Sequence, residues 1–289
     1  MPRVSVILPT YLRPLSLSRA VSSVLGQSYE DFELLIVDDA PSDETAAFAT
    51  ALEHPRVRYV PQTRNGGVAR ARNRGIAEAQ GEFLAFLDDD DVWRPEKLQR
   101  QVDRFDQASG ETGLVYTDFS AIGAGGVRRL GCLPAGRVQR QLLQGNFIGL
   151  STAMIRREVA TRCGEFDPDL PAQEDWEYWL RVSRRWDVQP VAEDLVIYDD
   201  TEDCDPRGGL RRSRRVEANL AARAQIYSRF RDDLKAAGMA GGFCVETVRR
   251  AAAAGARGAA CRAAVQGLVD QRFSPWVLQQ CTLALLGRG

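Results

Sequence analysis

Residues 82–93 read Glu-Phe-Leu-Ala-Phe-Leu-Asp-Asp-Asp-Asp-Val-Trp. The continuous apolar run 83–87 has the length of a strand that is buried on both faces of a parallel sheet. The four carboxylates 88–91 follow at its carboxyl end, which is where open α/β sheets bind their ligands. Adjacent carboxylates repel one another, and the oxygen-preferring cations Mg²⁺ and Mn²⁺ would relieve that repulsion. The pattern favours a metal-bound substrate here over a solvated acidic loop that caps the next helix.

Strand-like and helix-like segments alternate around this run. Strands are predicted at 4–8, 32–37, 57–60 and 83–87, and helices at 15–25, 42–52, 68–79 and 95–107. This alternation predicts an α/β fold with a doubly wound, mostly parallel sheet and right-handed crossovers. Later segments predict strands at 114–119 and 151–155, a loop or loose hairpin at 123–136, a helix at 174–185, and one or two short strands within 188–198.

The character of the chain changes near residue 205. Acidic residues are concentrated at 199–205 and arginines at 207–215, and helical patterns then continue at 216–234, 243–254, 259–269 and 275–286. We therefore expect an α/β domain over residues 1–205 and a helical C-terminal region over residues 206–289.

Composition excludes several classes of protein. The 289 residues carry a formal net charge of −1, which argues against a general nucleic-acid binder. The six cysteines are far apart, so they are expected to be small buried groups in a reducing cytosol. Apolar runs stay below the roughly 18 residues of a membrane span, so we expect neither a signal peptide nor a spanning helix. His54 is the only histidine, so a Ser-His-Asp hydrolase site is not expected.

Further acidic and basic groups belong near residues 88–91. Asp38-Asp39 ends the second predicted strand at the same sheet edge, and an acid there commonly accepts hydrogen bonds from a nucleoside. Tyr11, after the first strand, could stack on a base or be an ordinary loop aromatic. The glycines and arginines of residues 64–75 suit a diphosphate at a helix start, although a solvated surface is the alternative for most of these arginines.

Glu174-Asp175 begins the predicted helix 174–185. A helix N-terminus stabilises an anionic carboxylate, so a helix cap is one interpretation of this pair. The other is a general base, because an ionised and partly enclosed carboxylate beside a nucleotide site can accept a proton from a substrate. The residues alone leave both interpretations open.

Five motifs, taken together and in order, resemble the family-2 glycosyltransferases with the glycosyltransferase A-type fold, over about residues 3–200. They are Val-Ser-Val-Ile-Leu-Pro-Thr-Tyr, Glu-Leu-Leu-Ile-Val-Asp-Asp, Asn-Gly-Gly-Val-Ala-Arg-Ala-Arg-Asn, Phe-Leu-Asp-Asp-Asp-Asp and Glu-Asp-Trp-Glu-Tyr-Trp-Leu-Arg. The resemblance implies inverting transfer of a sugar from a nucleoside diphosphate donor, with UDP favoured, to a hydroxyl group. Residues 1–205 would then be the nucleotide-sugar-binding catalytic domain.

The resemblance also implies roles for single residues. Asp88 and Asp90 match the family's Asp-x-Asp motif, with Asp90 on a Mn²⁺ or Mg²⁺ ion, and Asp175 matches the catalytic base. The remaining positions implied or expected to bind the donor are Pro9, Thr10, Tyr11, Asp39, Arg72, Asp88 and Asp89. Residues 145–151 are expected to close over the acceptor.

Two departures from the family pattern matter. The Gln-x-x-Arg-Trp motif of processive members is missing, so transfer of single sugars is expected rather than polymer synthesis. The late metal-binding histidine of some members is also missing, which leaves Asp199, Asp200 or water as the further ligand.

The resemblance sets expectations for partners. The acceptor would be a glycan, a lipid-linked sugar or a small molecule in bacterial surface polysaccharide or other glycoconjugate synthesis. The enzyme would work in the cytoplasm or at the inner face of the membrane. The C-terminal helices could cover the site, form a homodimer or make a peripheral membrane contact.

Two other functions remain as alternatives. A sugar-phosphate nucleotidyltransferase normally needs a Gly-rich loop with Arg and Lys after the first strand, where this chain has Pro-Thr-Tyr-Leu-Arg at 9–13. A non-catalytic nucleotide-sugar-binding module is disfavoured because the acids are all retained.

Overall fold

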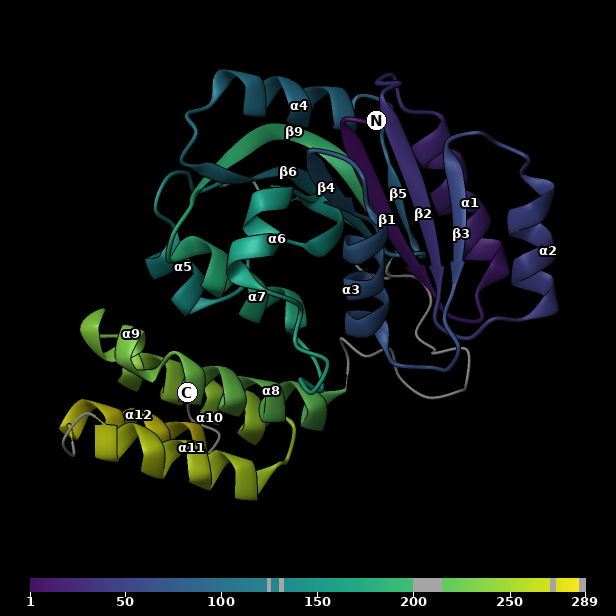
Figure 1. Cartoon of the computed structure of the whole chain (residues 1–289). Helices are drawn as coiled ribbons and strands as arrows, with labels where there is room; N and C mark the ends of the chain where they lie inside the picture. The colour runs from purple at the N-terminus through teal and green to yellow at the C-terminus, as the bar shows by residue number, and fades with distance from the viewer. Residues whose placement is uncertain (124–125, 130–132, 200–214, 271–273, 286–289) are drawn as a thin grey trace.

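A computed structural model describes all residues except 124–125, 130–132, 200–214, 271–273 and 286–289 (Figure 1). Its described residues form a nine-stranded sheet with the order β3-β2-β1-β4-β8-β6-β9-β5, and β7 pairs with β6 outside this path. The strands are β1 (Val4–Thr10), β2 (Phe32–Asp38), β3 (Val57–Pro61), β4 (Phe83–Phe86), β5 (Asp91–Trp93), β6 (Thr112–Gly123), β7 (Gly126–Arg129), β8 (Ala153–Arg156) and β9 (Asp187–Asp199).

The helices of the first 200 residues are α1 (Pro14–Leu25), α2 (Asp43–Ala51), α3 (Val68–Glu78), α4 (Lys97–Gln107), α5 (Gln139–Gln144), α6 (Arg157–Cys163) and α7 (Glu174–Ser183). β3, β2, β1 and β4 run parallel to one another, whereas β8 is antiparallel to β4 and to β6. The expected mostly parallel α/β sheet is confirmed.

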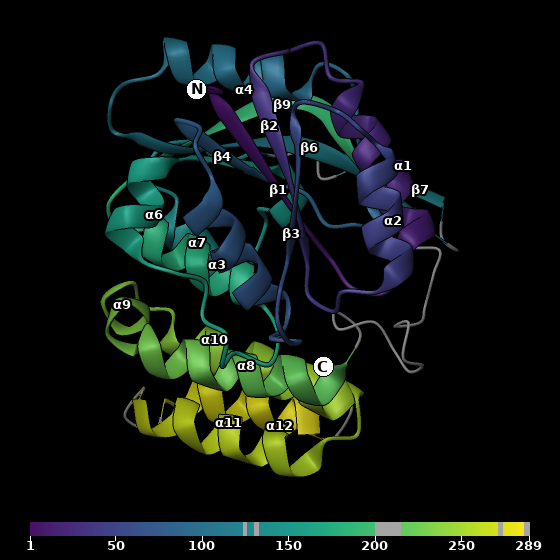
Figure 2. The same ribbon diagram turned by 45° about the vertical axis from the view of Figure 1, so that its right-hand side comes forward.

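Strand β1 explains why the sheet has helices on both faces. Its alternate side chains point in opposite directions, so both faces need cover. Val6 and Leu8 belong to the core that contains α1 and α4, whereas Ile7 belongs to the core that contains α3 and α7. Figures 1 and 2 show α1 and α2 on one side of the sheet and α3, α6 and α7 on the other. The buried run 83–87 lies between both layers, as its composition predicts.

Several elements differ from the sequence prediction. Helices α5 and α6 and strand β5 were not expected, because elements of 6, 7 and 3 residues are too short to show a period. One or two short strands were predicted within 188–198, and the structure has one long strand there, β9, of 13 residues. The predicted helix 216–234 is broken at Phe230, whose buried side chain lies between α8 (Val216–Arg229) and α9 (Arg231–Ala236).

The C-terminal region is helical, as expected. It continues with α10 (Ala240–Ala253), α11 (Arg257–Asp270) and α12 (Pro275–Leu285), and forms a separate layer beneath the α/β part (Figure 1). Ile226, Phe230 and Phe243 share a core with one face of the sheet, whereas α10, α11 and α12 pack around a second core of small side chains. The predicted boundary at 205/206 falls among residues 200–214, outside the described residues.

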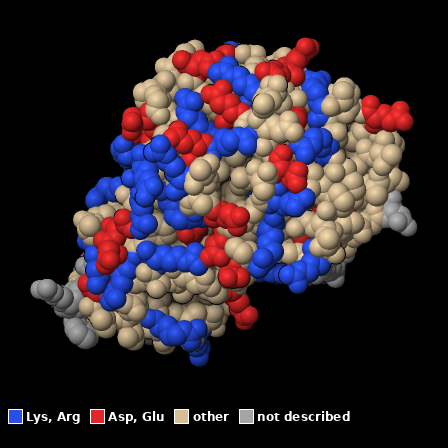
Figure 3. Space-filling view, in the orientation of Figure 1, with Lys and Arg blue, Asp and Glu red and all other residues tan. Residues whose placement is uncertain are grey.

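Two expectations from composition can be checked against the structure. The helices that the structure describes are all too short or too polar to cross a membrane. Cys244 and Cys281 are buried as expected, but Cys261 is exposed, so that expectation is wrong for it. Figure 3 shows basic and acidic side chains interspersed over the drawn face, as the near-zero net charge suggests.

Candidate active site

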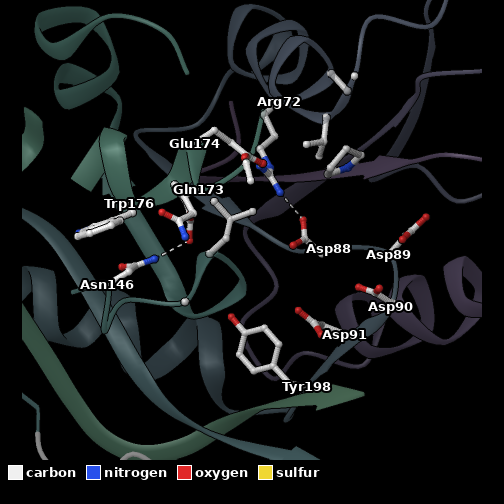
Figure 4. Close-up of a pocket in the computed structure, with 18 of the residues that line it drawn as sticks. Arg72, Asp88, Asp89, Asp90, Asp91, Asn146, Gln173, Glu174, Trp176 and Tyr198 are labelled. Carbon is white, nitrogen blue, oxygen red and sulfur yellow. Dashed lines mark hydrogen bonds and ion pairs between the residues drawn. The ribbon is translucent and has the colours of Figure 1, made fainter. Parts of the chain in front are cut away.

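A cavity of 1040 Å³ lies at the carboxyl ends of β1, β2 and β4, between the sheet and the C-terminal helices. All nine residues predicted to form the site line this one cavity: Pro9, Thr10, Tyr11, Asp39, Arg72, Asp88, Asp89, Asp90 and Asp175. Figure 4 shows residues 88–91 on one side of it, and Glu174 and Trp176 on another. Because β1, β2, β4, α3 and α7 bring these residues together, the expectation that the strand ends meet at one sheet edge is confirmed.

The end of β1 is held by the acidic segment. The hydroxyl of Thr10 donates to Asp89 Oδ2 at 2.8 Å, and the backbone N–H of Tyr11 points to the same oxygen at 3.4 Å. Arg13 Nη1 lies 2.8 Å from Asp90 Oδ2 and 3.5 Å from Asp89 Oδ1. Arg13 was not predicted as a site residue, although its position directly after the 9–11 segment was a signal for it.

The acidic cluster is divided among separate partners. Asp88 pairs with Arg72, Asp89 and Asp90 pair with Arg13, and Asp91 accepts a hydrogen bond from the Ser151 hydroxyl. Asp89 and Asp91 are 6% and 3% exposed, so these two carboxylates belong to the protein interior rather than to a solvated loop. Burial and the neighbouring Asp90 raise the pKa of Asp89 to about 7. Arg13 and Arg72 therefore offset part of the mutual repulsion, and the raised pKa of Asp89 shows that part of it remains in the free protein.

The Asp38-Asp39 doublet divides into two roles. Asp38 accepts hydrogen bonds from the Tyr59 hydroxyl at 2.8 Å and from the Ala40 N–H at 3.0 Å, which holds the chain after β2. Asp39 lines the cavity and accepts from the N–H groups of Gly66 and Gly67 at 2.8 and 2.9 Å. Burial raises the pKa of Asp39 although these N–H groups oppose the rise. Asp39 thus fixes the loop before α3; its contact with a nucleoside stays a prediction.

Arg72 connects two walls of the cavity. Its Nη2 lies 2.7 Å from Asp88 Oδ1, and its Nη1 lies 2.8 Å from Glu174 Oε1. The Arg72 side chain is 5% exposed and that of Glu174 is 9% exposed, so this pair is shielded from water, whereas Asp88 is 32% exposed. Arg70, two residues earlier, is exposed, which fits the solvated surface given as the alternative for most arginines of residues 64–75. The predicted contact of Arg72 with a diphosphate would therefore be made by a guanidinium that already binds two carboxylates.

Asp175 lies in the first turn of α7, next to Glu174. The Asn146 side-chain amide donates to its Oδ2 at 2.8 Å. Burial, followed by the charge of Glu174, raises the pKa of Asp175 to about 6, while Arg72 opposes the rise. Gln173 precedes the pair with a left-handed backbone, φ 59°, which is uncommon outside glycine and asparagine. A carboxylate with a pKa near 6 is ionised at neutral pH and still basic enough to accept a proton.

Two tryptophans fix the position of α7. Trp176 Nε1 donates to the Leu142 carbonyl at 2.7 Å, and Trp179 Nε1 donates to the Ile148 carbonyl at 3.0 Å. These bonds join α7 to α5 and to the middle of the following segment 145–151, which the sequence predicts to close over the acceptor. That segment contributes Gly145, Asn146, Gly149 and Leu150 to the cavity wall. Its place is as expected; its closure stays a prediction.

The residues present suit a divalent cation that arrives with a diphosphate. Among the described residues there is no group of three His, Cys, Asp or Glu side chains that could hold a metal alone. Mg²⁺ is commonly held by one or two carboxylates together with substrate phosphates and water. Asp88 and Asp90 line the cavity and could supply two such carboxylates. Asp199 ends β9, but its side chain and all of Asp200 lie outside what is described.

The C-terminal helices contribute residues that sequence reasoning missed. Arg215, Asn219, Arg223 and Arg250 line the same cavity. Asn219 accepts a hydrogen bond from the Gln173 amide at 2.9 Å, which joins α8 to the start of α7. A helical pattern shows which face of α8 is buried but not what it packs against, so these residues carried no signal of their site.

Comparison with known proteins identifies the family. The model described as Glycosyl transferase family 2 matches residues 5–164, which is more than half of the chain. The chain belongs to glycosyl transferase family 2. The matched range contains all the residues predicted to bind the donor and the predicted metal ligand Asp90. The proposed base of this glycosyltransferase, Asp175, lies beyond the matched range.

The relatives support the same conclusion. The chain is 30% identical over 188 residues to WfgD of Escherichia coli, a UDP-Glc:α-D-GlcNAc-diphosphoundecaprenol β-1,3-glucosyltransferase. The aligned residues cover 65% of this chain and 72% of WfgD. Other relatives are longer, and the match covers 33% of one of them.

Solved structures show the glycosyltransferase A-type fold. S. aureus TarS 1–349 with UDP-GlcNAc superposes with a TM-score of 0.74 at 17% identity, covering 100% of this chain and 89% of that one. The mannosyltransferase PcManGT of Pyrobaculum calidifontis with GDP-Man and Mn²⁺ gives 0.61 at 21% identity, covering 99% and 87%. The family and fold favour a sugar transferase over the nucleotidyltransferase and the binding module.

Proposed function

We propose that this transferase moves a single sugar, with inversion, from a nucleoside diphosphate sugar to a hydroxyl acceptor. The observation that carries the proposal is the Arg72 bridge. Arg72 binds Asp88, which lies on the donor side of the cavity, and Glu174, which lies on another wall next to the proposed base Asp175. Inversion needs attack from the face opposite the departing diphosphate, so a base and a diphosphate site on different walls suit it.

UDP-sugars are the favoured donors. WfgD takes UDP-Glc, and TarS was solved with UDP-GlcNAc. Both support a UDP-sugar as the donor of the present transferase. Thr10, Tyr11 and Asp39 would bind the nucleoside at the ends of β1 and β2. The PcManGT complex with Mn²⁺ supports a divalent cation at Asp88 and Asp90, where it would neutralise charge on the departing diphosphate.

Asp175 performs the proton transfer in this proposal. The acceptor hydroxyl donates to the Asp175 carboxylate, attacks the anomeric carbon and passes its proton to that carboxylate as the new bond forms. Asn146 orients the carboxylate through its 2.8 Å hydrogen bond. Glu174 keeps the pKa of Asp175 raised, so that the base accepts a proton more readily.

The acceptor would be a glycan, lipid-linked or small-molecule hydroxyl in bacterial surface polysaccharide or other glycoconjugate synthesis. WfgD, which acts on a diphosphoundecaprenol-linked sugar, supports a lipid-linked acceptor and work in the cytoplasm at the inner face of the membrane. Single-sugar transfer is proposed because the Gln-x-x-Arg-Trp motif is missing from the sequence.

The test measures nucleotide release and product stereochemistry with a panel of UDP- and GDP-sugars and Mn²⁺. We expect release of the nucleoside diphosphate and a product of inverted anomeric configuration. Release of pyrophosphate, or a product of retained configuration, would contradict the proposal.

Asp175→Asn tests the base directly, because asparagine keeps the shape and caps a helix nearly as well as aspartate. We expect turnover to fall by about 10²- to 10⁴-fold, the usual contribution of a general base, with donor affinity unchanged. Turnover close to that of the wild type would assign Asp175 to capping and move the search to Glu174 or Glu177.

A further inference from the structure

Arg223 of α8 is a buried cation between aromatic rings. Its side chain is 3% exposed, and its guanidinium carbon lies 4.4 Å from the ring centroid of Phe243 and 5.2 Å from that of Trp176. The two rings are themselves stacked, with centroids 5.8 Å apart. Stacking on aromatic faces holds the guanidinium plane in a fixed orientation.

The hydrogen bonds of Arg223 are incomplete. Nε donates to the Thr247 hydroxyl at 3.1 Å, but Nη2 is buried with no hydrogen-bond partner. Within the part of the chain that the structure describes, Arg223 forms no ion pair, and the nearby Glu246 carboxylate is bound by Arg250 at 2.7 Å. A buried charge without a counter-ion is costly, and such groups are normally paired.

Arg223 remains charged despite this cost. Burial, and then the neighbouring Arg250, lower the pKa of Arg223 to about 10, so the guanidinium is protonated at neutral pH. The guanidinium therefore carries a positive charge that forms no ion pair with any carboxylate of the described residues. A bound anion would complete its hydrogen bonds and offset its burial.

The position of Arg223 identifies the substrate that could supply this anion. Arg223 lines the active-site cavity, and it also lines a second cavity of 610 Å³ between α8, α10 and α11. Trp176, on which it stacks, directly follows the proposed base Asp175. The acids proposed to bind the donor, residues 88–91, lie on the other side of the cavity (Figure 4).

We propose that Arg223 is an anion subsite for the acceptor, which carries a phosphate, diphosphate or carboxylate group close to the hydroxyl that is glycosylated. Arg215 and Arg250 line the same wall and would raise the local concentration of an anion. This inference rests on the proposed function, because it assigns a substrate class to the acceptor side of that site.

The first experiment needs no turnover. Inorganic pyrophosphate is titrated calorimetrically into the full chain in EDTA, so that binding through a metal at residues 88–91 is prevented. We expect saturable binding that weakens about 10- to 100-fold in Arg223→Gln, the loss typical of charged hydrogen bonds, and that is largely kept in Arg223→Lys. Melting of Arg223→Gln should occur at or above the wild-type temperature, because an unpaired buried charge has been removed.

Arg249→Gln is the matched control. Arg249 is an exposed neighbour of Arg250 on α10, and its side chain bonds to Gln280 outside the cavity. Its pyrophosphate affinity should equal that of the wild type. Equal affinity of wild type and Arg223→Gln, or failure of the wild type to bind pyrophosphate, would overturn the proposal.

The second experiment identifies the source of the anion. Transfer is compared on four glycosides of one sugar: an uncharged benzyl glycoside, a 1-phosphate, a diphosphate with a short isoprenoid chain, and a benzyl uronate. We expect the wild type to favour one anionic class, and Arg223→Gln to lose that preference, with KM raised more on the anionic glycosides than on the uncharged glycoside. Equal loss on all four would make Arg223 structural and overturn the proposal.

The two proposals fail in different ways. If no acceptor reacts with any donor, the proposed transfer fails, while the pyrophosphate titration still decides whether Arg223 binds an anion. If transfer occurs but the titration shows no effect of Arg223, only the anion subsite is lost.

Discussion

Replacing Arg72 by methionine should change both the stability of the fold and the pH at which the enzyme works. Arg72 is 5% exposed and pairs with Asp88 at 2.7 Å and with Glu174 at 2.8 Å. Methionine keeps most of the volume but removes the positive charge that Arg72 places beside the Glu174 carboxylate, which is 9% exposed. Removing one partner of a buried ion pair typically costs about 3–5 kcal/mol. We expect a loss of that size in the free energy of unfolding.

The same substitution should raise the pKa of Asp175. In the wild type, burial and Glu174 raise this pKa to about 6, and Arg72 lowers it. Without Arg72 the opposing charge is gone, so the pKa moves further above 6. A base works only when deprotonated, so the acidic limb of the rate profile shifts to higher pH, and the largest loss occurs below neutrality.

Urea unfolding and the pH dependence of kcat measure these two effects. Arg74→Met is the control, because Arg74 lies on the same helix but is 53% exposed and pairs only with Glu78 among the described residues. An exposed pair of this kind contributes roughly 0.3–0.5 kcal/mol, and its loss should leave the pH profile unchanged. An Arg72→Met profile identical to the wild type would refute the argument that Arg72 sets the basicity of Asp175.

Three further outcomes are expected. The wild-type rate should fall as the pH falls through about 6, because Asp175 becomes protonated; a flat profile from pH 5 to 8 would contradict this. Asp90→Ala should abolish the Mn²⁺ dependence of nucleotide affinity in calorimetry. The same substitution should change the free energy of unfolding by only about 1 kcal/mol, because the loss of the 2.8 Å pair with Arg13 is partly offset by weaker repulsion of Asp89. Gly149→Ala should lower activity and melting temperature, because its Cβ would lie 2.2 Å from the Tyr198 hydroxyl; the control Gly145→Ala meets nothing within 4 Å and should keep the wild-type melting temperature.

The sheet edge was predictable because it depends on local patterns. The apolar runs that become β1, β2 and β4 each end at a polar residue, and parallel strands place those ends together. Asp39 and Asp88 could therefore be assigned to one site without knowledge of any contact, whereas Thr10 was assigned to it by the family resemblance. The same argument could not predict which arginines pair with these acids, because Arg13 is 77 residues from Asp90 and Arg72 is 102 residues from Glu174 in the sequence.

The interior position of Asp89 and Asp91 could not be predicted for a related reason. A run of four acids suggests a solvated or metal-bound loop when only neighbours in sequence are considered. In the fold, Asp91 begins the short strand β5, and its carboxylate meets Ser151 from a segment 60 residues away. Three residues of strand are too few for a periodic signal, so the pairing of β5 with β9 could only be found in three dimensions.

The pairing of the acids changes the argument for a metal. Arg13 and Arg72 already bind Asp88, Asp89 and Asp90, so they offset part of the repulsion that a cation would otherwise relieve in the free protein. A diphosphate entering the cavity would bring new negative charge and its own oxygen ligands, and a cation shared between it and Asp88 and Asp90 would then be favoured. Metal and donor should therefore bind cooperatively. Mn²⁺ should raise the affinity for the nucleotide, and by the same linkage Mn²⁺ should bind only weakly when the nucleotide is absent.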